Sequence, residues 1–237
     1  LAMCAGDGGI DLSGIALANL SGVLSAVIVA SMVSNVDQEG LYSTLFIVVA
    51  LLIGFLGGLI NGTLITRFGI TPILCTLGTQ MAFTGLSVII SGGKAVVVGS
   101  PEPLSSIGND FWFGAPISFI VFLAVAALIG AALKYTPFGR WLMLSGSNPL
   151  AALYAGFPRT GVVTATYALS GTLSGLSGVI IAARNVNVKW DYGASYLLIA
   201  ILIAIMAGVR PEGGYGRIVC VVFSAVAFSA KAIIIKL

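Results

Sequence analysis

The chain contains no histidine and few charged residues, with 11 Lys and Arg and 8 Asp and Glu among 237 residues. Without histidine, His-based catalytic triads, HExxH zinc sites and imidazole proton relays are excluded. Charged residues make up 8% of the chain, whereas an ordinary soluble domain carries about 25%. Hydrophobic residues make up 58%. We therefore expect a protein that is solvated mainly by membrane lipid and that is not an enzyme.

Motifs for metals, nucleotides and nucleic acids are also missing. Cys4, Cys75 and Cys220 have no CxxC spacing and lie in or beside apolar runs, where a free thiol behaves as a small hydrophobe. The nearest match to a GxxxxGK[ST] phosphate loop, at residues 92–94, lacks the upstream glycine. The charges are scattered singly and form no nucleic-acid patch. We expect this chain to hold neither a metal nor ATP.

Seven apolar blocks divide the chain, and each is near the length of a membrane span except the short sixth block. A bilayer core about 30 Å thick needs roughly 20 apolar residues per helix. The alternation required of membrane β-strands is missing. We therefore expect an all-α integral membrane protein, a bundle of about seven spans in a single domain over residues 1–237. The blocks cover 14–36, 41–66, 72–90, 112–134, 160–183, 194–209 and 217–235.

Lysine and arginine are distributed unequally between the loops on the two sides of this expected bundle. One side carries three of them, Lys94, Arg184 and Lys189. The other side carries six, namely Arg67, Lys134, Arg140, Arg159, Arg210 and Arg217. Because cytoplasmic loops are enriched in these residues, we expect the side with six to face the cytoplasm.

Glycine pairs inside two of the expected spans predict close helix packing. Gly58 and Gly62 in one span, and Gly171 and Gly175 in another, have the small-xxx-small spacing that lets helix backbones approach. The same spacing also suits helices that slide during a transport cycle, and the sequence alone does not separate the two roles.

The polar link from Tyr135 to Arg159 predicts a short surface helix between two spans. Ser147 or Asn148 can cap such a helix, Pro149 suits its first turn and Gly156 can end it. This segment is either an ordinary connection or the docking site for a cytoplasmic motor.

Six motifs follow one another between about Gly8 and Ser229. They are Gly8-Gly9-Ile10-Asp11-Leu12-Ser13, Gly58-Leu59-Ile60-Asn61-Gly62 with Ile65-Thr66-Arg67, Thr76-Leu77-Gly78-Thr79, Phe138-Gly139-Arg140, Gly146-x-Asn148-Pro149-x-Ala151-Ala152 and Gly213-Gly214-Tyr215-Gly216. In this order they resemble the motifs of bacterial sugar ABC-importer permeases, the group that contains the ribose, xylose and galactose permeases.

The resemblance implies a multi-pass subunit of the bacterial inner membrane that forms the path for a monosaccharide or similar small polar solute. It implies four partners: membrane lipid, a second permease in a homo- or heterodimer, a cytoplasmic ATPase that binds ATP and Mg, and a periplasmic sugar-binding protein. It also implies nine or ten spans in the complete subunit, so we expect Leu1 and Leu237 to be interior points of a longer chain.

The resemblance makes the cytoplasmic link a coupling segment, at about 138–157, that fits a cleft in the ATPase. The residues of this sequence that match the family motifs there are Phe138, Gly139, Arg140, Gly146, Asn148, Ala151, Ala152 and Gly156.

Polar residues within the apolar blocks are candidates for the substrate path. Asp11 would be a functional acid at membrane depth, or a helix cap together with Ser13. The other candidates can bond either a neighbouring helix or a passing sugar hydroxyl, and they are Asn61, Thr76, Thr79 and Gln80.

Two further readings compete with the sugar importer. An ion-coupled secondary transporter should show intramembrane acids or broken-helix ion sites in paired halves, and Asp11 is the single acid available. Related permeases carry branched-chain amino acids or a furanone signal, so the solute stays open.

Overall fold

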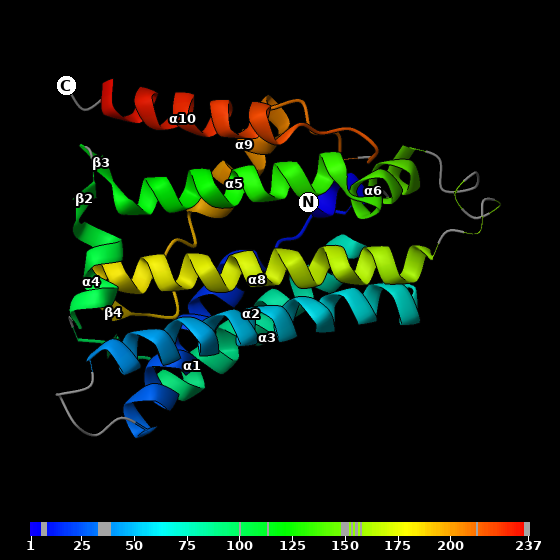
Figure 1. Cartoon of the computed structure of the whole chain (residues 1–237). Coiled ribbons are helices and arrows are strands. Elements are labelled where there is room, and N and C mark those ends of the chain that lie inside the picture. The colour runs from blue at the N-terminus through cyan, green and yellow to red at the C-terminus, as the bar shows by residue number, and fades with distance from the viewer. Residues whose placement is uncertain are drawn as a thin grey trace.

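Long apolar helices lie side by side in a computed structural model of the chain (Figure 1). The helices are η1 Ala2–Ala5, α1 Gly14–Met32, α2 Glu39–Phe68, α3 Pro72–Ser91, α4 Glu102–Asn109, α5 Ile117–Tyr135, α6 Pro137–Ser147, α8 Arg159–Asn185, α9 Tyr196–Met206 and α10 Ile218–Ile234. The structure describes residues 1–5, 9–32, 39–99, 101–112, 114–147, 152, 154, 156, 158–211 and 213–234.

Two short antiparallel pairs join the loops between these helices. Strand β1 (Val96–Val97) pairs with β4 (Asn187–Val188), and β2 (Phe111–Trp112) pairs with β3 (Ala115–Pro116). Each strand has two residues. The pairs fasten loops at one end of the bundle and form no layer of their own.

Each of the seven apolar blocks contains a helix, which confirms the all-α class. Five helices within the described residues are long and apolar enough to cross a membrane: α1, α2, α3, α5 and α8. The sixth block is the short α9, with 11 residues, and α10 has 17 residues. The chain is therefore a multi-pass membrane protein.

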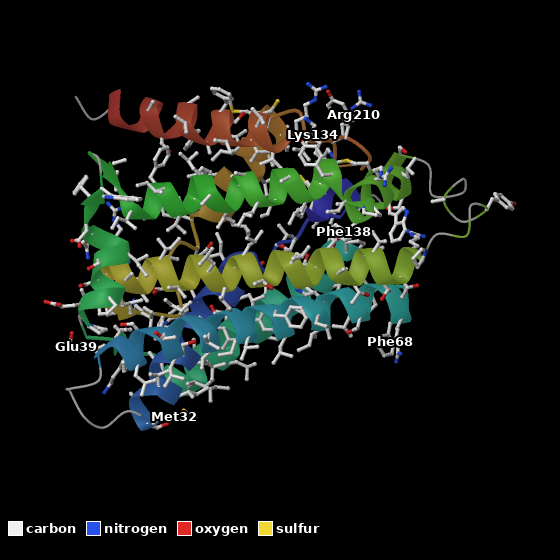
Figure 2. All side chains as sticks on the ribbon, viewed as in Figure 1. Met32, Glu39, Phe68, Lys134, Phe138 and Arg210 are labelled. Carbon is white, nitrogen blue, oxygen red and sulfur yellow. The ribbon has the colours of Figure 1, made fainter. Side chains whose placement is uncertain are left out.

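The loops alternate between the two ends of the bundle as the sequence predicts. Figure 2 shows Met32 and Glu39 at one end, and Phe68, Lys134 and Arg210 at the other. The loops that hold the six cations therefore gather at one end. Under the positive-inside rule this is the cytoplasmic end, and we use that name for it below.

The core lies between α1, α2 and α8, where α2 packs against α8 more extensively than any other pair of described elements. Glycines allow the backbones of α2 and α8 to approach this closely. A Cβ at Gly58 would lie closer than 3.0 Å to backbone atoms of Tyr167, and one at Gly171 would lie 2.7 Å from Gly58 Cα. The structure thus places the predicted glycine pairs against each other, with Gly62 against Thr164 and Gly175 against Ala50.

The second half of the bundle is loosely covered by the rest of the chain. Within the described residues, neither α5 nor α9 contains a buried residue. Both helices consist mostly of apolar residues, so their outer faces suit lipid or another protein helix rather than water.

Candidate functional site

A non-helical segment, residues 9–13, leads into α1 and carries the central acid of the bundle. Asp11 Oδ1 accepts hydrogen bonds from the Ser13 backbone N–H (3.1 Å) and from Ser13 Oγ (2.8 Å). Its Oδ2 accepts a hydrogen bond from Ser170 Oγ at 2.8 Å. Three hydrogen bonds therefore end on the carboxylate and fix its orientation.

The position of Ser170 places this acid deep in the bundle. Ser170 is the twelfth of the 27 residues of α8, so Asp11 lies close to the midpoint of a span. Non-helical backbone is tolerated at membrane depth where protein or a water-filled cavity surrounds it. Asp11 also accepts from the N–H of Ser13, whose carbonyl begins α1 by accepting from Leu17, as a helix cap does. A role of this acid in the substrate path stays a prediction.

Asn61 of α2 joins the same cluster. Its Nδ2 donates to Ser13 Oγ at 2.8 Å, and the side chain is 1% exposed. Its Oδ1 has no hydrogen-bond partner among the described residues, and neither has the buried hydroxyl of Tyr167. We call Asp11, Ser13, Asn61 and Ser170 the polar node; it connects α1, α2 and α8.

The other predicted path residues lie on α3. Buried Thr76 donates to the carbonyls of Pro72 (2.9 Å) and Ile10 (3.2 Å), so it holds the segment before α1. Thr79 Oγ1 donates to the Thr76 carbonyl within its own helix, and Gln80 is half-buried. The structure therefore brings together Asp11, Asn61 and Thr76, and it gives Thr79 a bond inside α3.

A second non-helical segment, residues 186–195, runs back into the bundle beside α1. A Cβ at Gly22 would lie 3.1 Å from Val188 Cγ1, and a Cβ at Gly193 would lie 3.8 Å from Ile15 Cγ2. From Val188 to Gly193 the segment thus runs from Gly22 back to Ile15, towards the start of α1 in the interior of the bundle. The following α9 has 11 residues and rises roughly 16 Å, about half of a bilayer core. This re-entrant segment explains the short sixth block.

Asn19 fastens the re-entrant segment to α1. Its Nδ2 donates to the carbonyls of Trp190 (3.0 Å) and Tyr192 (2.9 Å), and the residue is 4% exposed. The Tyr192 hydroxyl also bonds Asn187 Oδ1 at the start of the segment. Asn19 and Ser170 were not among the residues predicted from the sequence. For Asn19 the available signal was the short sixth block, which indicates a re-entrant segment that some polar side chain must hold.

Replacing Asn19 by leucine should therefore loosen the re-entrant segment. The change removes two buried donors from backbone carbonyls, so we expect the unfolding free energy to fall by about 2 kcal/mol. Hydrogen exchange at residues 188–193 should become faster, measured by mass spectrometry on the purified protein. Ser25 is the matched control, because its Oγ is buried without a hydrogen-bond partner among the described residues. Ser25→Ala should change neither quantity, and equal effects of the two variants would contradict the assignment.

The predicted coupling segment lies at the cytoplasmic end. Phe138 is half-buried and Arg140 is exposed on α6, and Figure 2 shows Phe138 at the same end of the bundle as Lys134. Ala152 is 3% exposed, whereas Gly156 is exposed and has φ 72°. Asn148 and Ala151 lie outside the described residues. Ala152 is thus placed for packing within the chain.

Two glycines of this segment are required by close backbone contacts. A Cβ at Gly139 would collide with the Leu133 backbone across the α5–α6 turn, and one at Gly146 would collide with Cys4 and Gly214. The Gly214 N–H donates to the Cys4 carbonyl at 3.2 Å. The motifs at 138–140, 146 and 213–216 therefore meet around α6 and η1, where they form one packed unit at the cytoplasmic end.

Comparison with known proteins gives one family match. The family described as "Branched-chain amino acid transport system / permease component" matches residues 1–235. The ribose import permease protein RbsC of Bacillus subtilis (strain 168) is 35% identical over 213 residues, which cover 90% of this chain and 64% of the relative. No solved structure matches the chain.

Two relatives are autoinducer 2 import system permease proteins LsrD. The protein of Yersinia enterocolitica serotype O:8 / biotype 1B (strain NCTC 13174 / 8081) is 30% identical over 223 residues, covering 92% of this chain and 65% of the relative. The protein of Escherichia coli O9:H4 (strain HS) is 31% identical over 224 residues, covering 92% and 66%. The chain therefore spans slightly less than two thirds of the length of these relatives.

Proposed function

Because the chain belongs to the family of branched-chain amino acid transport system permease components, we propose that it is the membrane-spanning subunit of an ATP-driven importer. The observation that carries this proposal is the family match over residues 1–235 of a chain with five membrane-length helices. The relatives described above are import permeases for ribose and for autoinducer 2. We assign it a monosaccharide or a similar small polar solute.

The polar groups of the interior favour a neutral solute. The polar node offers hydroxyls and an amide, and its one carboxylate, on Asp11, already accepts three hydrogen bonds. The unpartnered Asn61 Oδ1 and Tyr167 hydroxyl can exchange hydrogen bonds with a sugar hydroxyl. A zwitterionic amino acid would instead need fixed opposite charges to replace its hydration. Of the two solute classes, a polyol therefore fits this interior better.

Energy and affinity would come from partners. ATP and Mg would bind a separate cytoplasmic ATPase, and a periplasmic binding protein would deliver the solute to this subunit and a second permease in the bacterial inner membrane. The segment at 138–157 is the proposed contact for the ATPase. It lies at the end of the bundle with the six cations and holds Tyr154, which is 88% exposed.

The proposal is tested by uptake of radiolabelled ribose into proteoliposomes containing the full-length permease, its ATPase and its binding protein. Tyr154→Asp should lower ATP-dependent uptake at least about tenfold, because a charge would replace a central aromatic contact. Phe68→Asp is the matched control, since Phe68 is 72% exposed at the same end but lies outside the segment. That control should retain uptake within about twofold.

Competition with unlabelled solutes decides the substrate class. Unlabelled ribose should displace the label, while leucine, a zwitterion, should not. Uptake that follows an ion gradient without ATP would reject the ATP-driven mechanism. Unchanged uptake in Tyr154→Asp would reject the coupling segment but leave the importer itself standing.

A further inference from the structure

An open groove of about 830 Å³ lies between α5 and α10, outside the polar node. The two helices lie side by side in Figure 1, and a Cβ at Gly130 of α5 would lie 3.8 Å from Ile218 Cβ of α10. The wall on α5 is made largely of small residues, including Ala126, Ala127 and Ala131. The volume falls within the roughly 300–1,000 Å³ of pockets that hold organic ligands.

The length of the groove matches one leaflet of a bilayer. Along α5 it extends from Leu123 to Lys134, which corresponds to a rise of roughly 17 Å. Half of a hydrocarbon core about 30 Å thick is about 15 Å. The groove therefore runs from the cytoplasmic end of the bundle to about the membrane midplane, and its apolar walls suit a single acyl chain.

The cytoplasmic end of the groove is positively charged. Lys134, in the last turn of α5, and Arg217, just before α10, both line it and are exposed. The Arg217 carbonyl accepts the first backbone hydrogen bond of α10, from the Val221 N–H. The free N–H groups of the first turn of α10 therefore point towards the cytoplasmic end, where the two cations lie. Two cations and a helix N-terminus together form a site for an anion.

Tyr135 adds an interfacial aromatic beside these cations. It lines the groove, is 74% exposed and lies 5.2 Å from Lys134 Nζ, measured to its ring centroid. Tyrosine is enriched at the level of lipid headgroups. The groove thus has an acyl-length apolar part and a cationic, aromatic end at headgroup level.

From this charge complementarity we infer that the groove binds an anionic phospholipid of the cytoplasmic leaflet. Its phosphate lies between Lys134, Arg217 and the first turn of α10, and one acyl chain lies along Ala127 and Ala131. Basic pockets between membrane helices on this side favour anionic headgroups. The site does not depend on which solute the protein carries, so lipid binding can be measured separately from uptake.

The test measures binding of phosphatidylglycerol to the full-length permease–ATPase complex by native mass spectrometry, with phosphatidylethanolamine, a zwitterion of zero net charge, as the competitor. Replacing both Lys134 and Arg217 by glutamine should weaken phosphatidylglycerol binding about thirtyfold, or about fivefold for each cation. The matched control is Arg67→Gln with Arg159→Gln, which removes two exposed cations from the same end but outside both the groove and the segment at 138–157. An equal loss in both double variants would reduce the site to a general surface charge and overturn the inference.

A second variant tests the acyl-chain part without touching the charges. Ala127→Phe should block the groove and displace the lipid, whereas Ala124→Phe, on an exposed position of α5 outside the groove, should not. A benzophenone attached to Ala127→Cys, in a Cys220→Ser background, should give a phospholipid adduct on illumination. An adduct with a peptide, from further chain or a second copy, would mean that a protein helix fills the groove and would reject the lipid site.

Discussion

Replacing Gly58 by leucine is expected to prevent stable packing of α2 against α8. A Cβ there would lie closer than 3.0 Å to the backbone of Tyr167, and backbone cannot move aside as a side-chain tip can. The helices would have to separate along their whole contact, so we expect a loss of about 3 kcal/mol or more in unfolding free energy. Thermal unfolding of the full-length protein, followed by size-exclusion chromatography, measures the effect.

The control for this prediction is Gly85→Leu on α3. Gly85 is exposed, and a Cβ built there meets no atom within 4 Å. Leucine also forms helices more readily than glycine, by up to about 1 kcal/mol. The control should therefore be as stable as the parent protein or slightly more stable. Equal midpoints for the two leucine variants would show that the α2–α8 glycines are not packing residues.

Replacing Asp11 by alanine should destabilise the polar node and stop uptake. The Ser13 N–H, the Ser13 hydroxyl and the Ser170 hydroxyl would each lose an acceptor. Hydrogen bonds to charged groups contribute about 1.5–3 kcal/mol, so we expect about 3 kcal/mol lower stability and at least tenfold lower uptake. Asp11→Asn keeps one acceptor oxygen and should retain more of both. Denaturant unfolding and proteoliposome uptake measure the two effects.

A double-mutant cycle separates a specific bond from general damage. Asp11→Ala and Ser170→Ala should be non-additive by about 1–2 kcal/mol, because they remove the same hydrogen bond. Ser177→Ala is the matched control, since its hydroxyl binds the Leu173 carbonyl of its own helix. That substitution should add to Asp11→Ala without coupling. Additivity in both pairs would mean that Asp11 does not act through Ser170.

Hydropathy predicted the helices because the bilayer sets both their length and their composition. The glycine spacing at Gly58 and Gly171 likewise predicted close approach, although it did not tell which helices meet. Fold class and the main packing residues could thus be obtained from local patterns. These patterns depend on neighbours in the sequence and on the solvent, not on distant partners.

The polar node and the re-entrant segment depend on distant partners and were only partly predicted. Asp11 and Asn61 attract notice as polar residues in apolar surroundings, whereas Ser170 resembles the other serines of its helix, whose hydroxyls bond their own backbone. Asn19 is one amide in an apolar helix until Trp190 and Tyr192 lie beside it. Ala152 was expected in a coupling contact from its motif; its 3% exposure could not be read from the sequence, and its role in coupling stays a prediction.

The distances along the chain between these partners have a consequence for biosynthesis. Asp11 meets Ser170 across 159 residues, and Asn19 meets Trp190 across 171. At about 5–20 residues per second, a ribosome needs roughly 8 to 34 s to make the second partner after the first. During that interval α1, with the segment before it, carries a carboxylate that lacks the Ser170 donor and an amide that lacks the Trp190 acceptor. Its final insertion must therefore wait for α8 and α9, and a ribosome that stalls before them leaves a polar span for quality-control proteases.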